Sequence, residues 1–127
     1  MKLKLQDVER RSEYHYSGMA KLADLAEAFK GYQFSEEVLS KAEIHKVAMK
    51  DGIPSFSVTV RIEPDSTECT EGEETEFQCI GCELRDGKSK VAAICQMADE
   101  QLDGYAVQTE VFQVTKEKMD KLEANRM

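Results

Sequence analysis

The sequence contains few of the residues on which common enzyme motifs depend. Its seven glycines are isolated from one another, so neither a glycine-rich phosphate-binding loop nor a dinucleotide-binding fingerprint can form. There are two histidines, and the G-x-S-x-G and H-E-x-x-H motifs are absent, which removes the usual signatures of serine hydrolases and zinc peptidases. We therefore expect a protein that is not an enzyme, with no catalytic residue and no cofactor.

Long apolar segments are also missing. The longest wholly apolar run is Val91 to Cys95, whereas a membrane-spanning helix needs about 20 such residues. The basic residues near the amino terminus are not followed by the apolar stretch of a signal peptide. We expect a cytoplasmic protein without membrane contact, in which the four cysteines remain thiols rather than forming disulfides.

Negative charge is concentrated in one segment of the chain. The 127 residues carry a net charge of −8, and a chain of this length fits one domain, residues 1–127. Residues 63–76 contain seven acidic side chains and no basic one. Because this stretch has few apolar residues, we predict an acidic, flexible loop over residues 63–76.

Hydrophobic spacing predicts the elements of the first half of the chain. Leu3 and Leu5 indicate a short opening strand. Apolar residues at helical spacing predict a helix that begins at Ser17 and ends at Gly31. Ser35 is placed to cap a second helix, while residues 44–49 fit either its continuation or a strand. We favour the strand.

Strand patterns dominate the second half. Phe56 to Ile62 alternates strictly between apolar and polar residues. Residues 77–84 and 105–114 are further predicted strands, residues 91–102 carry a helical stripe, and Thr115 can cap a final helix. The order of these elements predicts an α+β fold, a mainly antiparallel sheet of about four to five strands with two to four helices packed on one face.

Two of the cysteines form a C-x-x-C motif, Cys79 to Cys82, which can hold zinc if the strand is interrupted there. Cys69 and Cys95 would have to supply the other ligands, but the second C-x-x-C pair of a zinc ribbon is missing. Acidic neighbours also disfavour a reactive thiolate. We therefore expect packing roles for these thiols and no bound metal, with zinc binding as the alternative.

The acidic segment is the best candidate for a functional site. A solvated connecting loop would explain its composition, but a loop of this length is uncommon in a small domain unless it is functional or disordered. The calcium-loop pattern is absent. We therefore predict that the segment binds a partner protein through carboxylates, namely Asp65, Glu68, Glu71, Glu73, Glu74 and Glu76.

The predicted partner is a basic protein, because clustered carboxylates can occupy a groove that normally binds phosphates. Such a protein would be a nucleic-acid mimic that inhibits a nucleic-acid-binding enzyme, as phage-encoded anti-CRISPR and anti-restriction proteins do. Direct nucleic-acid binding is not expected, because the sequence has no basic stripe with interleaved aromatic residues. The alternatives are a small structural or assembly component of a phage or complex, or a small zinc-binding domain.

Overall fold

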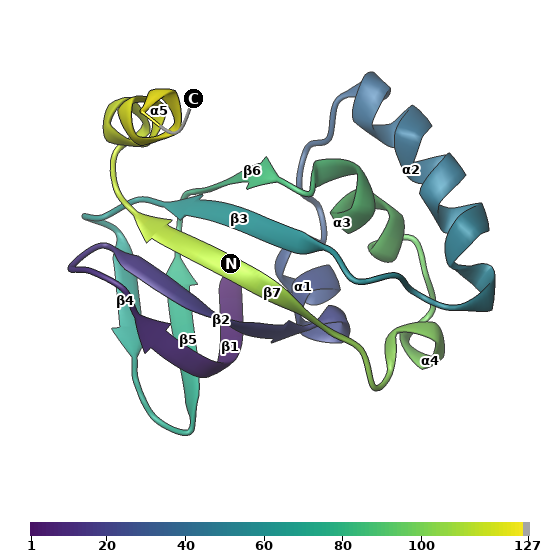
Figure 1. Ribbon diagram of the computed structural model, residues 1–127, viewed down its shortest axis with the longest axis horizontal. Coiled ribbons are helices and arrows are strands. Elements are labelled where there is room, and N and C mark those ends of the chain that lie inside the picture. Colours follow the sequence, from purple (N-terminus) through teal and green to yellow (C-terminus); the bar gives the residue numbers. More distant parts are fainter. Residues whose placement is uncertain (126–127) are drawn as a thin grey trace.

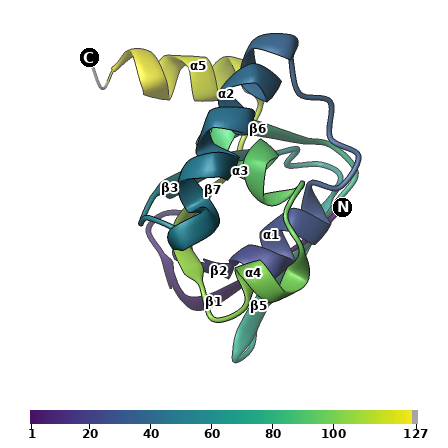
Figure 2. The same ribbon diagram turned by 90° about the vertical axis from the view of Figure 1, so that its right-hand side faces the viewer.

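Alternating burial builds the central strands of the computed structural model, which describes residues 1–125. In β3, Val58 and Val60 are fully buried, as the alternating sequence pattern predicts. Helices α1 to α4 gather on one side of the sheet, and α5 lies apart at the end of β7 (Figures 1 and 2). The elements are β1 (Lys2–Arg10), β2 (His15–Lys21), α1 (Leu22–Ala28), α2 (Glu36–Ala48), η1 (Met49–Asp51), β3 (Ser57–Ile62), β4 (Thr67–Thr70), β5 (Glu74–Cys79), β6 (Cys82–Asp86), α3 (Lys88–Ile94), α4 (Asp99–Leu102), β7 (Ala106–Gln113) and α5 (Lys116–Ala124).

The strands form one sheet in the order β4-β5-β1-β2-β7-β3-β6. The α+β class is confirmed, but the predicted numbers are too low. The described residues form seven strands and five α-helices. The β3–β7 pair is parallel, so the sheet is mixed. These two strands lie far apart in the sequence, and local patterns carry no information about such a pairing.

The predicted helix from Ser17 to Gly31 is wrong in its first part. Residues His15–Lys21 form β2, in which Tyr16, Gly18 and Ala20 are buried on one face. A Cβ atom at Gly18 would lie 3.0 Å from the carbonyl oxygen of Gln6, so glycine permits the close approach of β1. Only the last part of the apolar spacing, from Leu22 onward, belongs to a helix.

The second helix begins as predicted and continues further than predicted. The hydroxyl of Ser35 accepts a hydrogen bond from the backbone N–H of Val38 at 3.2 Å. The strand favoured for residues 44–49 is wrong, because α2 extends to Ala48. Ile44 and Val47 are exposed on the side of α2 opposite the core. Because α2 has apolar residues on both its inner and its outer side, it lacks the one-sided apolar stripe by which an amphipathic helix is recognised in a sequence.

Two other predicted elements are divided. The strand expected over residues 77–84 is interrupted after Cys79, and its two parts belong to β5 and β6. The helical stripe of residues 91–102 is split between α3 and α4, both of which turn their apolar residues toward the core. The final helix is confirmed, since the Thr115 hydroxyl caps α5 through the N–H of Lys118.

The sheet is strongly curled. β1 bends between Gln6 and Glu9, where its pairing with β2 shifts register and Asp7 adopts a positive φ of 52°. Its first half pairs with β5 and its second half with β2. The curl turns β5 toward β2, so that Phe77 and Tyr16 meet edge to face with ring centroids 5.0 Å apart.

A buried arginine holds the end of the sheet nearest α5. Arg61 is 7% exposed and donates hydrogen bonds to Glu83 at 3.0 Å, to Glu63 at 2.7 Å and to the carbonyl oxygen of Val114 at 3.1 Å. All donors of such a buried cation need partners, because an unpaired buried charge is costly. The cluster therefore joins β3, β6 and the segment that leads into α5.

Arg85 extends this cluster to the last helix. It donates to Glu83 at 2.9 Å and to Asp120 at 2.7 Å, and also binds Glu123. Burial alone would raise the pKa of Glu83, but hydrogen bonds from Arg61 and Arg85 outweigh burial and hold the pKa below its usual range. The carboxylate of Glu83 thus accepts hydrogen bonds from both guanidinium groups and connects the sheet to α5 through Arg85.

We predict that Arg61→Met destabilises the protein by roughly 2–4 kcal/mol, because Glu63, Glu83 and the Val114 carbonyl lose a charged donor. Urea unfolding measures this change. Arg11→Met is the matched control, since Arg11 makes an exposed ion pair with Glu9 and its loss should cost less than about 0.5 kcal/mol. Equal stability of the two variants would contradict the structural role given to Arg61.

Candidate functional site: the acidic hairpin

The acidic segment is not a single loop. Most of it forms the β4–β5 hairpin, in which Glu68 pairs with Gln78 and Thr70 with Glu76. β5 pairs in turn with β1 along five residues. Both ribbon views show the turn between β4 and β5 projecting beyond the rest of the fold (Figures 1 and 2). Residues 67–70 and 74–76 of the acidic segment thus belong to paired strands of the sheet, where the sequence predicted a loop over residues 63–76.

One group of carboxylates lies on the outer face of the hairpin. Directly opposed residues of an antiparallel pair share a face, and so do alternate residues of one strand. Glu68, Glu74 and Glu76 therefore lie on the face opposite that of the buried Phe77. Lys2 of β1 borders this group, with its Nζ atom 3.9 Å from a carboxylate oxygen of Glu76. Among the residues that the structure describes, Glu76 is the one member of these three acids with an ion pair.

A second group surrounds the hairpin turn. Glu71 and Glu73 are exposed and line a hollow of about 440 Å³ together with Asp7 and Arg10. Arg10 directs its donors to the backbone carbonyl oxygens of Ser12 and Glu13. Its guanidinium carbon also lies 5.3 Å from the centre of the Tyr16 ring. The hollow is thus lined by three carboxylates and one guanidinium, and the guanidinium donates its hydrogen bonds to backbone carbonyl oxygens rather than to these carboxylates.

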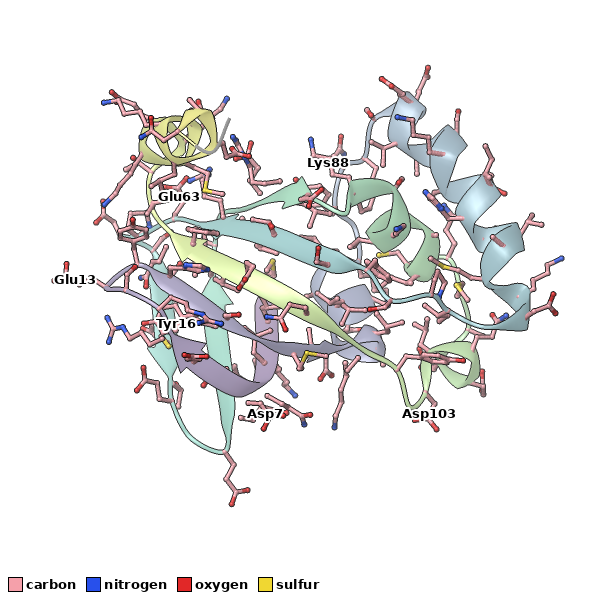
Figure 3. The ribbon with its side chains drawn as sticks, in the orientation of Figure 1. Asp7, Glu13, Tyr16, Glu63, Lys88 and Asp103 are labelled. Carbon is pink, nitrogen blue, oxygen red and sulfur yellow. The ribbon has the colours of Figure 1, made fainter. Side chains whose placement is uncertain are left out.

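Asp7 is a member of this surface that sequence reasoning missed. It lies some 60 residues before the hairpin, at the bend of β1, and Figure 3 shows it on the side of the fold from which the hairpin turn projects. Nothing in the local sequence marks it. Only the pairing of β1 with β5 brings it to Glu71 and Glu73.

The two ends of the segment have different roles. Asp65 is exposed in the turn that precedes β4. Glu63 belongs to the Arg61 cluster and lies beside α5 (Figure 3). Across residues 1–125, an ion pair is absent for five of the six predicted site residues, namely Asp65, Glu68, Glu71, Glu73 and Glu74. These five carboxylates are available to a partner.

The negative charge of Glu71 in the hairpin turn affects the pKa values of two side chains beneath it, Cys69 and Tyr16. Burial raises the pKa of the Cys69 thiol, and the carboxylate of Glu71 raises it further. Burial likewise raises the pKa of Tyr16, with a contribution from Glu71. Both groups are therefore held in their uncharged forms beneath the acidic surface.

The remaining cysteines are packed rather than exposed. β5 ends at Cys79 and β6 begins at Cys82, so the strand is interrupted within the C-x-x-C motif. Cys95 lies in a different part of the fold, with its thiol directed at the carbonyl oxygen of Ala26. Within residues 1–125, no group of three or more His, Cys, Asp or Glu side chains could hold a metal ion.

We predict that Cys82 of the native protein reacts slowly with iodoacetamide at pH 8. Burial raises the pKa of its thiol to about 11, so the reactive thiolate is roughly 100-fold less populated than for an ordinary cysteine. Mass spectrometry of the alkylated peptides measures the rate, with urea-unfolded protein as control. The rate should rise with pH through about pH 11. Rapid alkylation of native Cys82 near pH 7 would reveal an activated thiol instead.

No helix within residues 1–125 is both long enough and apolar enough to cross a membrane. The sequence matches no protein-family model, no curated protein and no solved structure.

Proposed function

We propose that this protein is a non-enzymatic binding module whose acidic hairpin engages a basic partner protein. The observation that carries the proposal is a group of carboxylates that have no ion pair within residues 1–125: four on the projecting β4–β5 hairpin and a fifth, Asp65, in the turn that leads into it. An ordered surface loses less conformational entropy on binding than a flexible loop does. A fixed array of negative charge also attracts a basic partner over a distance.

The finer proposal is that the hairpin imitates the phosphates of a nucleic acid. Alternate residues of β5, such as Glu74 and Glu76, lie about 6.6 Å apart, close to two axial phosphate repeats of a DNA strand. Glu68 on β4 adds a charge beside this row. The partner would then be a nucleic-acid-binding enzyme, and the protein its inhibitor, as anti-CRISPR and anti-restriction proteins of phages are.

A different surface favours a second candidate function. Ile44 and Val47 are 70% and 64% exposed on the outer side of α2. Exposed apolar side chains at helical spacing are typical of helix-mediated contacts. A structural or assembly component of a larger complex would use this helix and would need the acidic hairpin only for solubility.

We predict that the protein inhibits DNA cleavage by a basic nuclease and that the inhibition weakens steeply with salt, because exposed carboxylate contacts are screened. A panel of CRISPR nucleases and restriction endonucleases provides the assay. The variant D65N/E68Q/E71Q/E73Q/E74Q should lose inhibition by about tenfold or more while its melting temperature holds or rises, since each exposed charge contributes within about 0.5 kcal/mol to stability.

The matched control is E27Q/D51N/D99N/E100Q/D103N, which removes five exposed acids from elsewhere on the molecule. It has the same net charge as the hairpin variant, so equal loss of inhibition in both would mean that only total charge matters. Inhibition that survives in the hairpin variant, or that stays constant with salt, would contradict the acidic interface. A panel in which no enzyme is inhibited would contradict the nucleic-acid mimic and favour the assembly component.

A further inference from the structure

The outer edge of β4 is open to another strand. β4 is the first strand of the sheet and pairs only with β5 among the described residues. Within residues 1–125, the backbone of β4 makes no hydrogen bond to any backbone group outside β5. An unpaired edge presents free N–H and C=O groups that can bind an extended segment of another protein.

The opposite edge of the sheet is closed by the protein itself. The backbone N–H of Leu84 in β6 donates to the hydroxyl of Tyr32 at 3.0 Å. Arg85, also in β6, is bound by Asp120 and Glu123 of α5. Strand addition is therefore directed to β4 rather than to β6.

An exposed apolar side chain lies one strand in from the open edge. Ile80, which follows β5, is 89% exposed, more than any other large apolar residue among residues 1–125. It lines a hollow of about 520 Å³ whose other walls include Glu68 of β4 and Gln78 of β5. The position offers apolar area of the kind that a bound partner covers.

Ile80 is held outward by its neighbours in the chain. Cys79 is buried as the last residue of β5, and the next side chain points to the opposite face. Gly81 is fixed by a hydrogen bond from the N–H of Glu63 to its carbonyl oxygen at 3.2 Å. A Cβ atom at Gly81 would also lie 3.0 Å from the Glu63 side chain.

Charge determines what can occupy the edge. Antiparallel pairing of β4 with the β4 of a second copy, centred on Glu68, would bring Glu68 against its counterpart and Glu71 against Asp65 of the other copy, and like charges opposed across strands are destabilising. A basic segment would instead place its lysines or arginines against Glu68. The edge therefore suits a basic strand and opposes self-association.

We propose that the edge of β4 accepts an extended basic segment of the partner as an additional strand, with an apolar side chain of that segment packed on Ile80. This inference rests on the proposed function and specifies how the partner is bound. Backbone hydrogen bonds along β4 would supply affinity. Glu68 and Ile80 lie on one face, so they would select a segment whose basic and apolar side chains are an even number of residues apart and share a face.

The test uses two synthetic peptides of about ten residues, the length of a long strand. One, the lysine–valine peptide, repeats Lys-Thr-Val-Thr, so that its lysine and valine side chains share one face. The other, the lysine–proline peptide, has proline in place of each threonine, so it has equal charge but lacks half of the backbone donors. NMR measures their affinity and the exchange of those amide protons in Thr67–Thr70 that face the open edge rather than β5. The lysine–valine peptide should slow this exchange by about tenfold or more, since added strand hydrogen bonds protect amides, and should bind more tightly than the lysine–proline peptide.

Ile80→Ser should weaken binding of the lysine–valine peptide by about tenfold, the loss expected for one buried isoleucine. Ile44→Ser is the matched control, because Ile44 is similarly exposed on the distant α2, and it should bind as the unchanged protein does. Each of three outcomes would overturn edge docking: equal affinity for the two peptides, no protection of the β4 amides, or no effect of Ile80→Ser. All three would leave the acidic interface in place. Binding of neither peptide would also overturn edge docking, whereas the nuclease assay decides the proposed function separately.

Discussion

The shape of the molecule depends on one short connection. β5 and β6 lie five positions apart in the sheet, which would be about 24 Å in a flat sheet. The chain joins them through Ile80 and Gly81 alone, and three Cα–Cα steps reach about 11 Å at most. The sheet must therefore curl until its two ends approach each other. The hydrogen bond between Glu63 and Gly81 lies at this junction.

The curl accounts for both the stable and the exposed parts of the fold. It encloses Phe77 and Tyr16 on the inner face, so the hairpin is supported by packing although its outer face is polar. At the end of the sheet nearest α5, Arg61 and Arg85 form ion pairs with Glu63, Glu83 and two carboxylates of α5. Within residues 1–125, Glu68, Glu71, Glu73 and Glu74 of the hairpin have no ion pair, and these acids are exposed to solvent.

Local patterns in the sequence predicted the parts of the structure that local interactions determine. The strand at Val58 and Val60 and the caps of α2 and α5 were correct for this reason. β2 was missed because its inward residues Gly18 and Ala20 are small and give a weak alternation. The acidic segment was identified as the candidate site, but the hairpin and the contribution of Asp7 were not, because they depend on pairing with β1.

The central claim is that the sheet holds the acidic residues in a fixed arrangement, and backbone ¹⁵N relaxation tests it most directly. We predict order parameters near 0.85 for residues 67–70 and 74–79, the value typical of a rigid backbone. The residues of β3 should give the same value, as an internal reference. Values below about 0.6 across the hairpin, which indicate a flexible chain, would contradict the account and restore the acidic segment to a mobile loop.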